Sequence, residues 1–301
     1  MEKKDQEISV QKKEKEKKVR EPFNPRKEVK LIPGYLIVGI WVFFTIFLLV
    51  WILAASFSTA PEIMQGKVFK FESGFHFENY INAWNANSIS TFFMNSLLYA
   101  VATMVGAVVI SAPAAYVLSR FTFLGNKPIR SGFLIAMSIP NIMIVLPLMS
   151  ISIQLGINGS RGLLIFLYIG MQIPYTTTFL MTFFQNLSRT YEEAAAIDGC
   201  TPMMTFWRIM FPLAQPGIVT VSIFIFMNIW NEYFISLIFA SSSDIMPVGP
   251  GLKSVLSSMQ YTGDWGGLFA AVVIVFLPTL LLYVFLSEKI ISGVTGGGIK
   301  G

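Results

Sequence analysis

The sequence predicts an all-α membrane protein with six transmembrane helices. Apolar residues make up 54% of the 301-residue chain, charged residues make up 13%, and the mean hydropathy is +0.62. A soluble domain typically carries about 25% charged residues, so lipid must cover much of this chain. Six apolar segments are long enough to span a bilayer, because about 20 helical residues cross the hydrocarbon core.

We expect the spans, in chain order, over residues 31–57, 91–119, 130–155, 161–184, 216–240 and 266–289. The third and fourth contain Pro140, Pro147 and Pro174. These prolines are expected to kink the helices, since neighbouring helices can satisfy the backbone groups that a buried proline frees. The six spans form one transmembrane domain over residues 31–293.

Charged residues predict how the chain lies in the membrane. Residues 1–30 hold 11 of the 22 basic residues and almost no aromatic ones, which is typical of a disordered tail. With the N-terminus inside, 18 basic residues fall on the inner side and 4 on the outer side. The positive-inside rule therefore places both termini in the cytoplasm of a multi-pass protein of the cell membrane. Anionic lipid is a better partner for this tail than nucleic acid, which we do not expect to bind.

Few residues are available for metal or covalent chemistry. Cys200 is the only cysteine and His76 the only histidine in the sequence. Metal sites and His-based catalysis need clusters of such side chains. We therefore expect no metal site, no catalytic residues and no enzymatic activity.

A polar gap between the fourth and fifth spans carries the most specific motif, Glu193-Ala194-Ala195-x3-Gly199-x9-Ile209-x-Phe211-Pro212. Thr190 can cap a first helix, with Glu193 completing a capping box. Gly199 can end that helix in a left-handed turn, and Thr201 with Pro202 can start a second helix. The pattern predicts a helical hairpin over residues 190–212, on the cytoplasmic side by the charge rule.

This motif resembles the EAA signature of the permease subunits of ABC importers, with Phe211 where that family usually has leucine. Nearly everything after residue 30 is similar to the carbohydrate branch, and to the second permease of the maltose-type pair in particular. The residues that carry this likeness are Asn79-Tyr80, Asn95-Ser96, Leu252, Asp264-Trp265-Gly266, Pro278 and the Gly-rich C-terminal tail over residues 294–301.

The resemblance implies that the chain forms half of the translocation path for a sugar or oligosaccharide. Its implied partners are a second, homologous permease, two ATPase subunits that bind and hydrolyse ATP, and an extracellular solute-binding protein. No cofactor is implied on this chain, because its glycine run lacks the lysine and the strand-to-helix setting of a phosphate-binding loop. The residues implied to couple to the ATPase are Glu193, Ala194, Ala195, Asp198, Gly199, Ile209 and Pro212. The alternative for Glu193 is that it only completes the capping box with Thr190, a role compatible with a contact to the ATPase.

A polar cluster, Trp230-Asn231-Glu232-Tyr233, falls within the fifth predicted span. A carboxylate is costly there and must face the bundle interior, a water-filled path or a hydrogen-bonding partner. Trp230 and Tyr233, three residues apart, share one face of a helix. We therefore assign Trp230, Asn231 and Tyr233 to the substrate path, and Glu232 to a bond with a neighbouring helix or the cavity edge. The alternative is that Asn231 and Glu232 only join helices. Asn141, Gln172 and Tyr175 are weaker candidates.

Two other functions remain open from the sequence. An ABC importer for a solute other than a sugar would look nearly the same. An ion-coupled secondary transporter would need intramembrane acidic residues, and Glu232 alone provides little for ion coupling.

Overall fold

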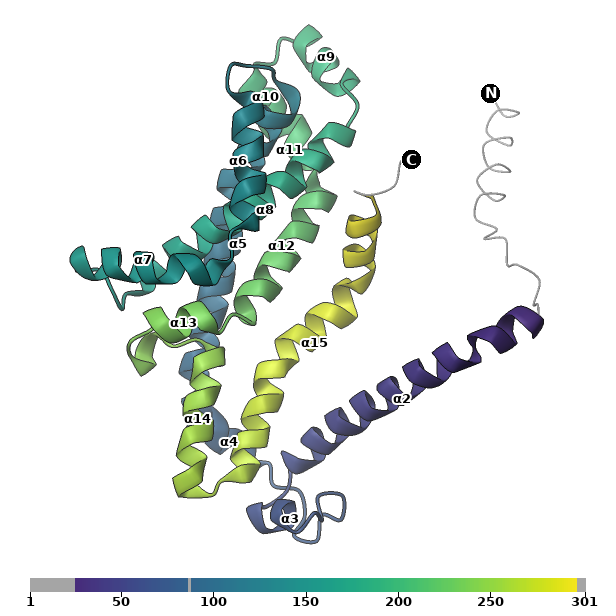
Figure 1. The fold of residues 1–301 in the computed structure, drawn as a ribbon, viewed down its shortest axis with the longest axis vertical. Helices are drawn as coiled ribbons and strands as arrows, with labels where there is room; N and C mark the ends of the chain where they lie inside the picture. Colours follow the sequence, from purple (N-terminus) through teal and green to yellow (C-terminus); the bar gives the residue numbers. More distant parts are fainter. Residues whose placement is uncertain (1–24, 86–87, 297–301) are drawn as a thin grey trace. The chain divides into compact units, whose positions relative to one another are not determined.

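The computed structural model describes residues 25–85 and 88–296, and no strand occurs within these ranges (Figure 1). The elements are α2 (Pro25–Ala55), α3 (Ala60–Met64), α4 (Glu78–Asn85), α5 (Ile89–Arg120), α6 (Asn126–Ser138), α7 (Asn141–Gln154), α8 (Arg161–Asn186), α9 (Thr190–Ile197), α10 (Pro202–Thr205), η1 (Phe206–Met210), α11 (Phe211–Leu213), α12 (Gln215–Trp230), α13 (Phe234–Phe239), η2 (Ser243–Ile245), α14 (Val248–Thr262) and α15 (Trp265–Gly296). The all-α prediction is confirmed.

Among the described residues, four helical segments are long and apolar enough to cross a membrane singly: Lys30–Ala55, Ile89–Arg120, Arg161–Asn186 and Trp265–Ser287. Two further pairs reach that length only together. These pairs are Asn126–Ser138 with Asn141–Gln154, bent by 95°, and Pro202–Leu213 with Gln215–Trp230, bent by 72°. Four predicted spans thus correspond to single helices, and the third corresponds to the first bent pair. The second bent pair joins the second arm of the predicted hairpin to α12, which covers the first part of the fifth predicted span.

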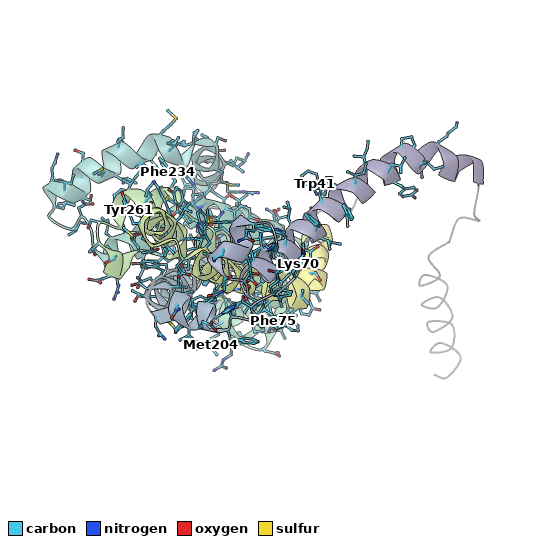
Figure 2. The ribbon with its side chains drawn as sticks, turned by 90° about the horizontal axis from the view of Figure 1, so that it is seen from below. Trp41, Lys70, Phe75, Met204, Phe234 and Tyr261 are labelled. Atoms are coloured by element: carbon cyan, nitrogen blue, oxygen red, sulfur yellow. The ribbon has the colours of Figure 1, made fainter. Side chains whose placement is uncertain are left out.

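The chain divides into two units, with the boundary after Trp51. In the first unit, every described side chain of α2 up to Val50 is exposed, and Trp41 projects from the helix surface (Figure 2). Residues 25–30, predicted to belong to a disordered tail, are helical. The rest of that tail lies outside the described residues, as does the end of the Gly-rich tail, whose residues 294–296 continue α15.

The core of the second unit, residues 52–301, is built around α5. This helix packs along α8 and α12, and most of its buried side chains are small, with the aromatic Phe92, Tyr99 and Tyr116 among them. Gly106 of α5 lies so close to Ile169 of α8 that a Cβ atom would stand 2.4 Å from the isoleucine Cδ1. Small residues allow this close approach, which is how membrane helices gain packing contacts without a hydrophobic driving force.

The third predicted span is not one kinked helix but two, broken at Pro140. Ile139 has extended backbone angles of φ −80° and ψ 118°, and α7 then starts at Asn141. A residue before proline avoids the helical region, and proline cannot donate a helical hydrogen bond. Pro147 and Pro174, in contrast, lie inside α7 and α8.

The fifth predicted span also ends early, at Trp230, so the expectation that residues 216–240 form one helix is wrong. The Asn231 side chain donates its Nδ2 at 2.8 Å to the Met227 carbonyl, which also accepts the Asn231 backbone N–H at 3.1 Å. The Glu232 carboxylate then accepts the backbone N–H groups of Ile235 at 2.6 Å and Ser236 at 3.0 Å, in the first turn of α13.

Glu232 also joins two helical segments. Tyr168 of α8 donates its hydroxyl to Glu232 Oε2 at 2.7 Å. One carboxylate therefore satisfies two free donors of a new helix and one buried phenol, which accounts for its presence inside an apolar segment. The predicted bond between Glu232 and a neighbouring helix is confirmed.

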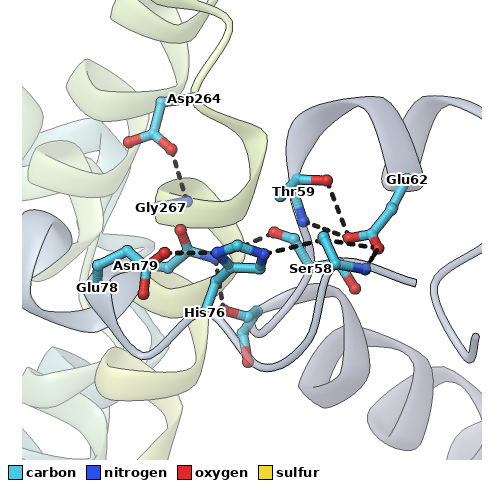
Figure 3. Close-up of polar contacts among 10 residues, drawn as sticks. Ser58, Thr59, Glu62, His76, Glu78, Asn79, Asp264 and Gly267 are labelled. Carbon is cyan, nitrogen blue, oxygen red and sulfur yellow. Dashed lines mark hydrogen bonds and ion pairs between the residues drawn. The ribbon is translucent and has the colours of Figure 1, made fainter. Parts of the chain in front are cut away.

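Within the second unit, α9 and α10 lie at one end, whereas α3 and the turn between α14 and α15 lie at the other (Figure 1). Polar contacts hold together the end that contains α3 and the start of α15 (Figure 3). Asn79 donates its Nδ2 to the carbonyls of Ser56 and Ser58, each at 3.0 Å, and the Asp264 carboxylate caps α15 by accepting the Gly267 N–H at 2.9 Å. Helix α15 can come this close because Gly266 has no side chain, and a Cβ there would stand 2.6 Å from the Ser58 carbonyl oxygen.

Glu62 organises the loop that follows α3. Its carboxylate accepts both the backbone N–H and the hydroxyl of Thr59, at 2.8 and 2.9 Å, and both the N–H and the hydroxyl of Ser73, at 3.0 and 2.8 Å. These bonds, led by the Thr59 and Ser73 backbone groups, lower the pKa of Glu62 from 4.5 to about 2. The loop is thus closed around an ionised side chain.

The first prediction concerns the pH dependence of this loop. Because the folded pKa is below the unfolded one, the stabilisation by Glu62 is complete above about pH 4.5 and is lost as the pH falls through about 2. Cleavage by pepsin within residues 58–77 should therefore accelerate across that range, and Glu62→Gln should be cleaved rapidly throughout it. The control is Glu72→Gln, which changes an exposed carboxylate of the same loop. Equal cleavage of the two variants would contradict the prediction.

The second prediction concerns the bonds to Glu232. Glu232→Gln places an amide N–H₂ against donors that need an acceptor, and should lower the free energy of unfolding by about 1–3 kcal/mol. Tyr168→Phe removes one of the three donors and should cost about 1 kcal/mol. The measurement is the thermal unfolding of the detergent-solubilised chain, with Asp198→Asn, at an exposed carboxylate, as the control. A Glu232→Gln chain that melts like the control would refute this role.

Candidate functional site

A cavity of about 600 Å³ lies where the broken span α6–α7 meets α8 and α12. Four of its lining residues are polar: Asn141, Gln172, Tyr175 and Asn228. The other lining residues are apolar: Ala136, Met137, Ile139, Met171, Pro174, Phe224 and Met227. The bend at Pro140 forms one wall, so the proline that breaks the span also shapes the cavity.

The polar groups of the cavity are held in place across two helices. Gln172 of α8 donates its Nε2 to Asn228 Oδ1 of α12 at 2.8 Å. That bond leaves the side-chain oxygen Oε1 of Gln172 and the side-chain amide hydrogens of Asn228 able to bond further partners. The Tyr175 ring packs against Phe179 with centroids 6.1 Å apart. The cavity therefore offers amide donors and acceptors beside an aromatic ring, a combination suited to a neutral, hydroxyl-rich solute.

The residues that we predicted to line the substrate path do not line this cavity. Trp230 is 3% exposed, stacks on Phe226, and donates its Nε1 to the Val275 carbonyl of α15 at 3.2 Å. Asn231 caps α12, and Tyr233 is exposed outside any helical turn, with φ −125° and ψ −44°. The premise that Trp230 and Tyr233 share one helix face is wrong, because the helix ends at Trp230.

Sequence reasoning ranked the cavity residues too low and missed one of them. Asn141, Gln172 and Tyr175 were minor candidates, and Asn228 was not considered. A signal for Asn228 did exist, since it is an amide within the highly apolar segment Gln215–Trp230. An amide is expected in such a segment only where it faces a partner or a polar cavity.

Residues 190–213 form a helix, a turn and a second helical segment, and the start of the first helix differs from the prediction. Helix α9 begins at Thr190 with Arg189 as the N-cap residue, and no side-chain capping bond forms there. The Ser188 hydroxyl bonds the Thr190 hydroxyl at 2.8 Å and accepts the Thr190 N–H at 3.3 Å. The capping box expected between Thr190 and Glu193 is therefore replaced by contacts to Ser188.

The turn of the hairpin follows the prediction. Gly199 has a φ of +78°, the Cys200 N–H bonds the Ala195 carbonyl at 2.9 Å, and the Gly199 N–H bonds the Ala196 carbonyl at 3.1 Å. This is the Schellman arrangement, which closes the end of a helix. Thr201 then caps the next helix by accepting the Met204 N–H at 3.3 Å, with Pro202 in the first helical position.

The second arm of the hairpin contains a π-helical turn, η1. The Phe211 N–H bonds the Phe206 carbonyl five residues back. Pro212 has no N–H for the next helical bond, and its ring would crowd the carbonyl four residues before it. The widened turn relieves this crowding, and the chain then bends by 72° into α12 after Leu213.

The residues predicted to contact an ATPase differ in exposure. Those with exposed positions are Glu193, Ala194, Asp198, Gly199 and Pro212. Ala195 is 1% exposed and Ile209 packs against the core, so these two hold the hairpin together. Sequence reasoning missed two large apolar side chains on the outer surface, Ile197 at 86% and Met203 at 66% exposed. Within the described residues, no group of three or more His, Cys, Asp or Glu side chains could hold a metal ion.

Comparison with known proteins adds the following. The family model for the inner membrane component of binding-protein-dependent transport systems matches residues 107–291. The chain is 33% identical over 267 residues to the diacetylchitobiose uptake system permease protein NgcG of Streptomyces coelicolor, covering 89% of this chain and 88% of that protein. It is 30% identical over 252 residues to the sulfoquinovosyl glycerol transport system permease protein SmoH of Agrobacterium fabrum, covering 84% and 88%.

A solved structure shares the fold. A chain of a bacterial ABC transporter involved in the import of the acidic polysaccharide alginate superposes with a TM-score of 0.77 at 20% identity, covering 89% of this chain and 98% of that one. At that identity the likeness concerns the fold alone. The matched range includes residues 190–213, α12 and every lining residue of the cavity. This chain therefore belongs to the inner membrane components of binding-protein-dependent transport systems, the permeases of ABC importers.

Proposed function

We propose that this chain is one of the two permease subunits of an ATP-driven importer, and that it forms half of the path for a sugar or oligosaccharide. The observation that carries the proposal is the cavity of about 600 Å³, with Gln172, Tyr175 and Asn228 in its wall. Amides bond sugar hydroxyls and an aromatic ring packs on a sugar ring face. Two similar permeases are also named for diacetylchitobiose uptake and for sulfoquinovosyl glycerol transport.

The partners in this proposal follow from the family. They are a second permease, two ATPase subunits that bind and hydrolyse ATP, and an extracellular solute-binding protein. The hairpin end of the second unit faces the cytoplasm, as the excess of basic residues on that side favours, and the opposite end meets the binding protein. The described residues carry the path and the coupling surface, while the partners supply the chemistry of ATP.

The coupling surface is the exposed part of the hairpin. Glu193 and Asp198 provide negative charge, and the exposed Ile197 and Met203 provide apolar area beside it. Such a surface suits a groove with apolar walls and basic groups on the ATPase. The Schellman turn and the Thr201 cap keep both arms from fraying, so the hairpin moves as one body when the ATPase dimer closes.

The third prediction tests the hairpin turn. No atom lies within 4 Å of the position of a Cβ on Gly199, so a substitution there meets backbone strain at φ +78° and no clash. Gly199→Val should reduce co-purification of the ATPase subunits and abolish ATP-driven uptake, because a β-branched residue is strongly disfavoured at positive φ. Gly199→Asn is the matched variant, since asparagine tolerates this region and should retain both. Equal behaviour of the two variants would exclude strain as the cause.

The fourth prediction tests the solute path. The importer is reconstituted with its partners, and ATP-dependent uptake of diacetylchitobiose, trehalose and longer oligosaccharides is measured. For the sugar that is carried, Asn228→Ala should lower apparent affinity roughly tenfold, the equivalent of about one hydrogen bond, with the yield of the complex unchanged. Asn231→Ala changes the same side chain three residues on, outside the cavity, and should have little effect on affinity. A loss of affinity in Asn231→Ala, with normal affinity in Asn228→Ala, would place the solute path at residues 230–233 instead. ATP-driven uptake of non-sugar solutes alone would overturn the sugar assignment.

A further inference from the structure

Arg120, the last residue of α5, has a buried charged side chain that neither the solute path nor the exposed coupling surface uses. The side chain is 5% exposed and lies against a second cavity of about 220 Å³, between the end of α5 and the hairpin. Beside Arg120, the lining of this cavity includes Tyr116, Arg189, Glu192 and Cys200. A buried guanidinium requires partners, and those present come from two other helical segments.

Two contacts define what Arg120 joins. Its Nη2 donates to the carbonyl of Leu187, the C-cap residue of α8, at 2.6 Å. Its Nε lies 3.5 Å from Glu192 Oε1, in the first turn of α9, and the Glu192 side chain is 20% exposed. One side chain therefore links the end of α5, the end of α8 and the start of the hairpin.

The ion pair is not optimised for stability. Neither Arg120 Nε nor Glu192 Oε1 has a hydrogen-bond partner within the described structure, so the two atoms attract each other without a hydrogen bond. A buried pair of this kind gains little net stability, because desolvation offsets the attraction. Its directional bond is the one to the Leu187 carbonyl, which fixes the guanidinium at the end of α8, and the ion pair draws Glu192 of α9 toward that fixed charge.

Apolar packing also connects the hairpin to the bundle, but it restrains less. Phe206 of η1 packs against Tyr116 of α5 and Phe184 of α8, with ring centroids 5.2 and 6.2 Å apart. Such contacts are non-directional, so rings can slide over one another while they remain buried. Arg120 adds to this apolar base a charged contact that joins the end of α5, the end of α8 and the first turn of α9.

We propose that Arg120 and Glu192 form the positioning pair that makes α5 and α8 follow the hairpin when the ATPase moves. This inference rests on the proposed function and adds a route for the motion, from α9 through one guanidinium to the ends of two spans. Glu193, the next residue, is exposed and belongs to the coupling surface. The two adjacent carboxylates thus have different roles: Glu193 contacts the ATPase, and Glu192 passes the motion of the hairpin to the spans.

The experiment uses the full complex in proteoliposomes and needs no solute. Met227→Cys places a reporter thiol in the large cavity, in a Cys200→Ser background. The rate of labelling by a maleimide is compared with and without ATP plus vanadate, and ATP hydrolysis is measured on the same samples. The variants added to this reference are Arg120→Gln, Glu192→Gln and both together. The matched control is Arg189→Gln, which removes a charge from the same small cavity, where the Arg189 side chain makes no bond to another described residue.

We expect the reference and the control to change their labelling rate with ATP and vanadate. Arg120→Gln and Glu192→Gln should lose most of that change, several-fold or more, while the ATPase remains bound and hydrolyses ATP. The double variant leaves no unpaired buried charge, so it remains informative if a single variant fails to assemble. The double variant should lose no more of the ATP-dependent labelling change than either single variant, as expected for two residues that act as one unit.

Two results would overturn the inference. The first is a normal labelling change in the double variant. The second is a loss of labelling change and hydrolysis in equal proportion with loss of bound ATPase, which would make the pair part of docking. If the reference itself neither hydrolyses ATP nor changes its labelling, the proposed function fails, and this inference fails with it.

Discussion

The need to satisfy every backbone N–H and C=O group inside an apolar segment governs this structure. The chain interrupts a helix near the middle of two such segments, at Pro140 and after Trp230. At the second break, side chains bond both helix ends: the Asn231 amide donates to the Met227 carbonyl in the last turn of α12, and the Glu232 carboxylate accepts two N–H groups in the first turn of α13. Because these bonds seal the break, α12 can end close to the cavity and the chain can turn away to form α13 and α14.

The sequence predicts the spans well because their signal is local and additive. Apolar length and composition decide whether a segment enters the membrane, and both can be read without knowing its neighbours. The breaks depend on partners far along the chain. Tyr168, which completes the set of donors on Glu232, lies 64 residues away. Pro140, Pro147 and Pro174 look equivalent in sequence, yet a helix stops only at Pro140, where the preceding residue becomes extended.

The difference between local contacts and contacts to distant residues also explains which parts of the site were predictable. The hairpin turn is built from contacts within six residues, so Gly199 and Thr201 could be assigned from spacing alone. The first cap was missed because the Ser188 hydroxyl lies just outside the motif and still reaches Thr190. The cavity is assembled from three separate helical regions, and a single segment such as residues 230–233 carries no information on which side chains converge there.

The shortness of α12 has a consequence for the membrane itself. A helix of 16 residues is about 24 Å long, whereas the hydrocarbon core of a bilayer is about 30 Å thick. Lipids that meet a short apolar helix must compress their chains, or polar protein and water must fill the difference. Next to α12 the chain provides polar protein groups, the hydrogen-bonded amides of Gln172 and Asn228, near one end of the helix. Helix α12 alone is therefore too short to cross the hydrocarbon core, and the polar cavity lies beside this short helix.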